Sequence, residues 1–297
     1  MPGPDQQRLP DPGGDAFYEP VAGGFTSTEL TRGPWDGSSQ HAGPPAALVG
    51  REVELCPGIG TDAGDRHVAR ITFEILRPVP IASLRVEADV VRPGRRVDMV
   101  EATLTDESGE ALIRARAWRM LRREVELPPG LASEEGGSPP RSAGRPGGKA
   151  GQPAGPDGLG AEAAFFPTGH DVGYHTAMEY RFATGGFLEP GPATTWMRMR
   201  VPLVAGEDPT PLQRVLAAAD SGNGISSTLD FRSYVFINLD LSVHLHRQPV
   251  GEWVCLDSIT VPEPTGVGMT DTMLFDEAGP MGRAAQSLLV DRRAEAG

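Results

Sequence analysis

Apolar and polar residues alternate along several stretches of the chain, and each such stretch predicts a strand with one buried face. In the first half these stretches are 67–76, 84–91, 98–105 and 111–121, and similar ones follow between 233 and 291. Two segments are predicted to be helices. The first begins at Gly43-Pro44-Pro45 and ends near Leu55, and the second begins at Pro211 after Thr210, an N-cap that Gln213 completes as a capping box.

The two halves share an internal spacing. Arg77 and the turn sequence Asp106-Glu107-Ser108-Gly109 recur 170 positions later as Arg247 and Asp276-Glu277-Ala278-Gly279. Each turn sequence separates two apolar runs and predicts a hairpin with glycine at its left-handed position. Two recurrences at one spacing indicate a duplicated fold unit.

A stretch rich in glycine and proline divides the two units. It is poor in apolar side chains and predicts a linker, because it cannot offset its ordering entropy. We expect a flexible N-terminal arm over 1–23, a first unit over 24–127, a linker over 128–165 and a second unit over 166–297. One helix followed by an antiparallel meander, repeated, is the order of an α+β double hotdog fold. An immunoglobulin-like sandwich would not need a capped helix at the same place in both halves.

Composition excludes several classes of protein. The net charge of −13 argues against a nucleic-acid or anionic-membrane binder. No apolar run approaches the roughly 20 residues of a membrane helix, and the N-terminus lacks the regions of a signal peptide. Two cysteines without a CxxC motif exclude a zinc ribbon and a disulfide scaffold. We therefore expect a cytoplasmic protein. Because exposed sheet edges tend to pair, we also expect a homodimer or a larger symmetric oligomer.

Residues 236–247 form the longest alternating run, FINLDLSVHLHR. One face is predicted to lie on the helix and comprises Ile237, Leu239, Leu241, Val243 and Leu245. The other face comprises Asn238, Asp240, Ser242, His244 and His246. Two histidines two positions apart could bind a metal, but no third ligand is evident, so we expect no metal.

Two polar residues stand in apolar surroundings. Asp220 ends the second helix, where a carboxylate opposes the helix dipole, and small residues beside it leave room for a ligand. Gln286 lies among small and apolar residues in the last strand, where a long amide needs a buried partner. From the residues alone, Asp220 is equally compatible with a turn and with a site. A structural role for Gln286 is the commoner case.

Several segments give a resemblance to a known family. The C-terminal half resembles the second hotdog of the type II acyl-CoA thioesterases, which hydrolyse fatty acyl-CoA, at AAADSGNG, FINLDLSVHLHRQPVGEWVCLDS and DEAGPMGRAAQSLLVDR. The N-terminal half is similar to their first hotdog at QHAGPPAALVG, ITFEILRPVP and SGEALIRARAWRM. The resemblance lies in the order and spacing of these segments and spans most of the chain outside the arm and the linker.

The resemblance implies a site and a mechanism. In that family an Asp on the helix, a Thr in the next strand and a Gln in the last strand hold the hydrolytic water, and these positions fall on Asp220, Asn238 and Gln286. Asn238 replaces the family's Thr. Asp220 would be the general base, and Asn238 and Gln286 would fix the water, without a cofactor. We expect the oxyanion and substrate site near Gly43 and His41.

The acyl chain of the acyl-CoA substrate is expected in an apolar channel lined by Leu216, Phe236 and Met273. Two rival functions remain open. Hotdog hydratases and dehydratases carry an active Asp and His five positions apart before the helix, the spacing of Asp36 and His41 here, although the usual Asn-Pro between them is missing. The second rival function is that of a non-catalytic acyl-CoA-binding protein or a regulatory subunit. The presence of Asn238 in place of Thr favours it.

Overall fold

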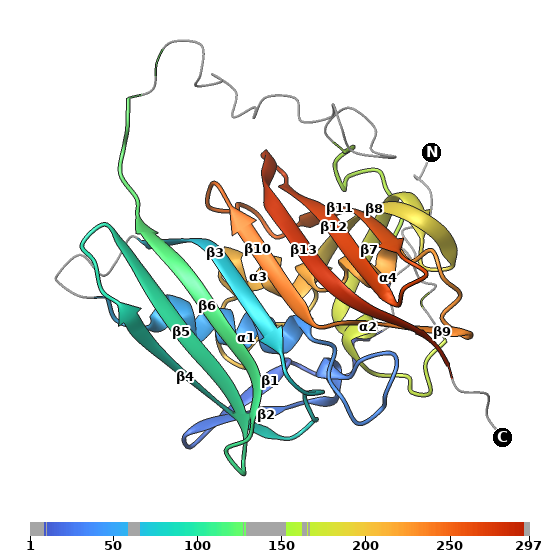
Figure 1. Ribbon diagram of the computed structural model, residues 1–297, viewed down its shortest axis with the longest axis horizontal. Coiled ribbons are helices and arrows are strands. Elements are labelled where there is room, and N and C mark those ends of the chain that lie inside the picture. Colours follow the sequence, from blue (N-terminus) through green and yellow to red (C-terminus); the bar gives the residue numbers. More distant parts are fainter. Residues whose placement is uncertain are drawn as a thin grey trace.

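The computed structural model describes residues 9, 11–58, 66–126, 128, 153–161, 165 and 167–293 (Figure 1). The first half contains β1 (Tyr18–Val21), β2 (Gly24–Ser27), a 3-10 turn η1 (Glu29–Thr31), α1 (Gly43–Leu55), β3 (Arg66–Ile75), β4 (Ser83–Arg92), β5 (Val97–Asp106) and β6 (Ala111–Leu121). The second half contains α2 (Tyr174–Ala177), β7 (Met178–Gly186), β8 (Glu189–Met199), α3 (Pro211–Ala219), α4 (Gly222–Ile225), β9 (Tyr234–Asn238), β10 (Asp240–Leu245), β11 (Val254–Pro262), β12 (Val267–Asp276) and β13 (Gly279–Arg292).

The described strands form one antiparallel sheet in the order β1-β2-β4-β5-β6-β3-β10-β13-β12-β11-β8-β7, and β9 pairs with β13. Figure 1 shows α1 and α3 together behind this sheet, where α1 packs on β3, β4 and β5 and α3 packs on β8 and β11. Each unit is therefore a sheet around one long helix, which confirms the predicted α+β double hotdog. Within the described ranges no helix is long and apolar enough to cross a membrane.

The two units meet at the β3–β10 pair with internal symmetry. Thr72 lies opposite Ser242, and these two residues are also counterparts at the spacing of 170 positions. Ile71 lies opposite Val243. The junction is thus related to itself by an approximate two-fold rotation. Gly109 and Gly279, in the corresponding hairpin turns, have φ angles of 86° and 117°. These left-handed conformations, which glycine adopts without a steric penalty, confirm the predicted turns.

Local sequence signals place the ends of both long helices. Helix α1 has the predicted bounds, and the Thr210 hydroxyl accepts the Gln213 N–H at 3.2 Å at the start of α3. The beginning of α1 lies against the end of α3 so closely that a Cβ on Gly43 would be 2.3 Å from the Ala217 carbonyl oxygen. This contact brings the loop before α1 next to the residue after α3.

The long alternating run near the site is interrupted, contrary to the prediction. Asn238 lies opposite Leu288, and Ser242 lies opposite Ala285. The chain of β9 and β10 therefore advances four residues where β13 advances three. Leu239 is the extra residue of a β-bulge, and the inward face changes there. Ile237 and Leu239 are each 52% exposed and do not face the helix, whereas Leu241, Val243 and Leu245 are buried as predicted.

Parts of the predicted arm and linker belong to the folded body. Phe17 and Tyr18 are fully buried, and β1 pairs with β2, so residues 16–21 are not a flexible arm. The Trp196 indole N–H donates to the Ala154 carbonyl at 2.6 Å, and Arg181 donates to the Pro156 carbonyl at 3.0 Å. These two contacts hold the segment around Ala154 and Pro156 against the folded body, although its composition alone predicts mobility. Residues 1–8 and 10 of the predicted arm and residues 129–152 and 162–164 of the predicted linker lie outside the described residues.

Candidate active site

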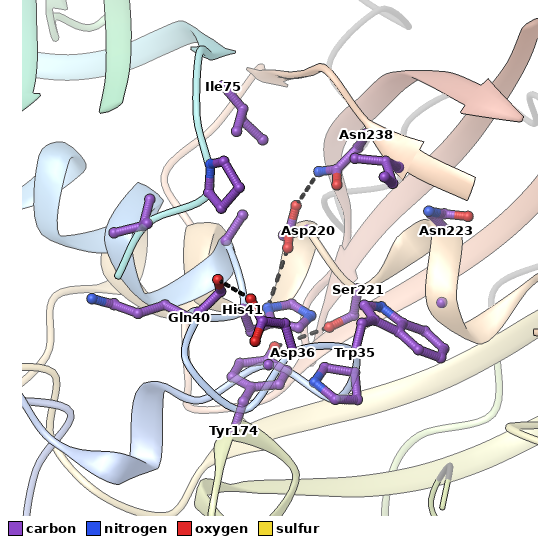
Figure 2. Close-up of a pocket in the computed structure, with 18 of the residues that line it drawn as sticks. Trp35, Asp36, Gln40, His41, Ile75, Tyr174, Asp220, Ser221, Asn223 and Asn238 are labelled. Carbon is purple, nitrogen blue, oxygen red and sulfur yellow. Dashed lines mark hydrogen bonds and ion pairs between the residues drawn. The ribbon is translucent and has the colours of Figure 1, made fainter. Parts of the chain in front are cut away.

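A cavity of about 460 Å³ lies where the two units meet (Figure 2). The first unit contributes residues of the loop before α1 and of the end of β3, and the second contributes the end of α3, α4 and the β9–β10 bulge. Its aromatic lining comprises Trp35, Phe165, Tyr174, Tyr180, Phe187 and Phe236. The volume lies within the range of small-molecule sites, roughly 300–1,000 Å³.

The three predicted site residues come together around Asp220, where Asp220 and Asn238 line the cavity and Gln286 is buried behind it. Asp220 is the C-cap of α3 and is 7% exposed. The Asn238 amide donates to Asp220 Oδ1 at 2.6 Å, and the Gln286 amide donates to the Asp220 carbonyl at 3.1 Å and to Oδ1 at 3.3 Å. The two amides supply donors to a buried carboxylate that the helix dipole disfavours. Asn238 reaches it because the bulge at Leu239 turns it inward.

The two amides are both directed at Asp220. Asn238 Nδ2 donates to its carboxylate, and Gln286 Nε2 donates to its carbonyl and its carboxylate. The Gln286 carbonyl oxygen accepts the backbone N–H of Asn223 at 3.2 Å. The amides therefore fix the rotamer of the carboxylate.

His41 completes the group around Asp220. Its Nδ1 lies 3.2 Å from Asp220 Oδ2, and Figure 2 shows Asp220 between His41 and Asn238. The imidazole stacks on the Tyr174 ring, with centroids 3.7 Å apart and planes 6° apart. Burial lowers the pKa of His41, and the nearby Asp220 charge opposes this shift. The imidazole is thus held neutral near neutral pH.

Gly43 does not present its amide to the cavity as expected for an oxyanion site. Its N–H lies 3.1 Å from His41 Nδ1 and is directed at that atom. Pro44 and Pro45, the next two residues of α1, have no N–H to offer. The start of α1 therefore positions His41 and does not line the cavity.

Sequence reasoning missed Tyr174 and Asn223. The Tyr174 hydroxyl donates to the Ala217 carbonyl at 2.7 Å and lies 2.9 Å from Ser221 Oγ, which ties the ring beneath His41 to the end of α3. Asn223 anchors Gln286 through its backbone and donates to the Phe236 carbonyl at 3.2 Å through its side chain. Tyr174 carries no sequence signal, because only the fold brings α2 to α3.

Two family models match this chain. The family model for the acyl-CoA thioesterase N-terminal domain matches residues 31–120, and that for the C-terminal domain matches residues 152–290. The two matches together span most of the chain. The chain belongs to the acyl-CoA thioesterase family. It is a thioester hydrolase.

Solved structures share the fold of this thioesterase at low sequence identity. A putative thioesterase II from Thermobifida fusca is 17% identical, with a TM-score of 0.63 over 89% of this chain and 91% of that one. A putative thioesterase from Novosphingobium aromaticivorans is 18% identical, with a TM-score of 0.62 over 92% and 98%. A hot dog fold protein from Alicyclobacillus acidocaldarius is 14% identical, with a TM-score of 0.60 over 89% and 90%. A search of curated proteins found no match.

Two of the three residues expected to line the acyl channel of the thioesterase lie elsewhere. Phe236 lines the cavity. Leu216 instead packs between the helices, where a Cβ on Gly50 would lie 2.3 Å from its Cδ1. Met273 lines a separate depression beside His244.

The Asp–His pair expected of a hydratase is not formed. Asp36 lies in an exposed turn, where its carboxylate accepts the Ser38 N–H at 2.9 Å, the Ser38 hydroxyl at 2.8 Å and the Ser39 hydroxyl at 2.6 Å. These bonds lower the pKa of Asp36. Within the described residues no hydrogen bond or ion pair joins Asp36 to His41, which is turned toward Asp220.

Neither cysteine of the thioesterase has the features of a nucleophile. Cys56 and Cys255 are both buried, and burial raises the pKa of each thiol, which disfavours the reactive thiolate. In the part of the chain that the structure describes, no group of three or more His, Cys, Asp or Glu side chains is arranged to hold a metal ion.

Proposed function

We propose that the thioesterase hydrolyses acyl-CoA by a water molecule activated at Asp220, without a covalent intermediate. The observation that carries this proposal is the convergence of Asn238 and Gln286, from two separate strands, on the carboxylate of Asp220 at the wall of the cavity. A buried carboxylate with both amides as donors is held in a single orientation. Such positioning converts a random encounter between water and thioester into an aligned one.

The cavity lining suits an acyl group. It is dominated by aromatic and aliphatic side chains, with the polar group of Asp220, His41 and Asn238 at one side. Apolar walls exclude competing water and accept an acyl chain, and the polar group marks where the thioester carbonyl would lie. We propose that the chain lies among Phe236, Tyr180 and Phe187 while the CoA portion extends through the mouth.

The test is thiol release from a panel of acyl-CoAs of increasing chain length. The wild-type protein should hydrolyse at least part of the panel, and Asp220→Asn should lower kcat by about 10²–10⁴-fold. The variant should still bind acyl-CoA, because the substitution conserves shape. Asp240→Asn is the matched control, since Asp240 bonds to the exposed Ser287 outside the cavity. Unchanged turnover in Asp220→Asn would refute the assignment.

The same panel separates the rival functions. A binding protein would retain acyl-CoA without releasing thiol, and a hydratase would hydrate crotonyl-CoA. The structure offers no support for the latter, because Asp36 is committed to its turn. The same acyl-CoA panel therefore distinguishes hydrolysis, binding without turnover and hydration.

We further propose a cytoplasmic enzyme that assembles as a homodimer or a larger symmetric oligomer. The acidic composition supports the location. The sheet ends at β1 and β7, and edge strands of this kind are pairing surfaces. Light scattering coupled to size-exclusion chromatography gives the assembly, and a monomeric mass would refute it.

A further inference from the structure

We propose that His41 Nε2 is the atom that takes the proton from the attacking water, and that Asp220 acts through His41. The inference rests on the proposed function, because it names the base in that hydrolysis. It changes the role of Asp220 from a direct base to a positioning residue.

The contacts of Asp220 carry the first step. Oδ1 accepts both amide donors, from Asn238 at 2.6 Å and Gln286 at 3.3 Å. Oδ2 faces His41 Nδ1 at 3.2 Å. Both carboxylate oxygens are therefore engaged with protein groups. A carboxylate held in this way is suited to orienting an imidazole.

The tautomer of His41 follows from a competition at Nδ1. This atom lies within hydrogen-bonding distance of two groups that require opposite protonation states, the Gly43 N–H at 3.1 Å and the Asp220 carboxylate at 3.2 Å. A bond to a carboxylate is roughly twice as strong as a neutral one. If Nδ1 were bare, Asp220 Oδ2 would face its lone pair and would lack a hydrogen-bond donor in a buried site, which is costly. We therefore assign the proton to Nδ1, and in this tautomer Nδ1 no longer accepts the Gly43 N–H.

This tautomer leaves the Nε2 lone pair free. The imidazole lines the cavity and its side chain is 14% exposed, and within the described residues Nε2 has no hydrogen-bond partner. The Tyr174 stack fixes the ring plane. The titratable groups that face His41 are Asp220 at the end of α3 and Tyr174 in α2. A carboxylate on Nδ1–H with Nε2 as base is the division of labour in hydrolytic triads.

The chemical step balances without a co-reactant. The water oxygen forms a bond to the thioester carbonyl carbon while its proton passes to Nε2 and the C=O π electron pair moves onto the carbonyl oxygen; Asp220 stabilises the resulting imidazolium. The oxyanion pair then restores the C=O bond as the C–S bond breaks, and the C–S electron pair leaves with sulfur. The imidazolium returns the proton to the CoA thiolate. The products are a carboxylic acid and the free thiol, and His41 is neutral again.

The tautomer can be measured in the wild-type protein without substrate. Nitrogen-15 NMR distinguishes a protonated from a bare imidazole nitrogen, and His41→Gln identifies the His41 signals among those of the six histidines. We expect Nδ1 protonated and Nε2 bare at neutral pH. A bare Nδ1 with a protonated Nε2 would overturn the proposal, whatever the activity of the enzyme.

Chemical rescue tests the catalytic role. His41→Ala should lower kcat/KM by about 10²–10⁴-fold. Added imidazole should restore activity at least tenfold by our estimate, in proportion to its neutral form, because it can occupy the vacated space and take the proton. His244→Ala is the control, because this exposed histidine lies outside the cavity, and it should keep wild-type activity with no response to imidazole.

The outcomes separate the two proposals. Retained turnover in His41→Ala, or a loss that imidazole does not restore, would show that His41 is not the base. Failure of the wild-type protein to release thiol from any acyl-CoA would instead refute the proposed function. Loss of activity in His41→Ala that added imidazole restores would support both the proposed function and the role of His41 as the base.

Discussion

At the scale of single residues, the site depends on which donors surround one carboxylate. Asn238 stands where the resembling family has Thr, and its amide donates to Asp220 Oδ1 at 2.6 Å. A hydroxyl has one donor and an amide has two, so Asn can make the donation to Asp220 that a Thr hydroxyl could make. The replacement is therefore compatible with a working site in this structure.

Replacing this donor should impair hydrolysis in a pH-dependent way. Asn238→Asp keeps the size but places a second carboxylate against Asp220, and the repulsion should lower kcat/KM at pH 7 by at least an order of magnitude. Like charges raise the pKa of a carboxyl, so the introduced group should protonate as the pH falls and again donate. A kcat/KM profile that recovers toward acidic pH, relative to wild type, supports this account. A profile parallel to that of wild type contradicts it.

At the scale of elements, two local features assemble the site. The bulge at Leu239 turns Asn238 inward, and the contact of α1 with α3 brings His41 to Asp220. The second feature requires glycine at position 43, since a Cβ there would meet the Ala217 carbonyl oxygen at 2.3 Å. Backbone cannot yield as a flexible side chain can, so the helices would separate.

Gly43→Ala should therefore reduce both stability and activity. Overpacking of this kind costs about 1–3 kcal/mol, and the shift should also separate His41 from Asp220. Urea unfolding and kcat/KM measure the two effects. Gly37→Ala is the matched control from the same loop, because a Cβ on Gly37 would meet nothing within 4 Å. Equal behaviour of the two variants would show that the helix contact does not position the site.

The sequence predicted elements wherever the deciding signal was local. Pro44, Thr210 and the glycines of the two hairpin turns each act within a few residues, and the structure confirms the elements they mark. The bulge was missed because the alternation continues through Leu239 without a break in composition. Asp220 and Gln286 were found as polar residues in apolar runs. The bond of His41 to Asp220 joins residues far apart in sequence, and no pattern in either segment predicts it.

At the scale of the whole molecule, one continuous sheet holds two units, and the site lies at their junction with Asp220 at the end of α3. The end of α1 corresponds to the end of α3, but it is closed by Arg119, which donates to the Val53 and Cys56 carbonyls at 2.9 and 2.6 Å. Asp98 accepts two further bonds from this guanidinium at 2.9 Å. A buried ion pair therefore closes the end of α1, whereas the end of α3 carries Asp220 at the cavity.

Acidification should destabilise the folded protein through its histidines. Burial lowers the pKa of His41, His170 and His175 below the ordinary value of 6.5. The unfolded chain therefore binds protons first as the pH falls, and the free energy of unfolding decreases between pH 6.5 and the folded-state pKa values. Partial burial raises the pKa of Glu54, and this carboxyl acts in the opposite direction.

The melting temperature should accordingly fall as the pH is lowered from about 7 through 6.5. Glu54→Gln removes the opposing carboxyl and should steepen the fall. Thermal unfolding followed by circular dichroism over this range measures both. A melting temperature that rises on acidification would show that these histidines are not buried in neutral form.

The most direct measurement is a crystal structure of the wild-type protein with a non-hydrolysable ketone analogue of acyl-CoA. The account predicts the analogue's carbonyl carbon in the cavity beside His41 and Asp220, with the acyl chain among the aromatic side chains. A carbonyl bound away from these two residues would contradict it.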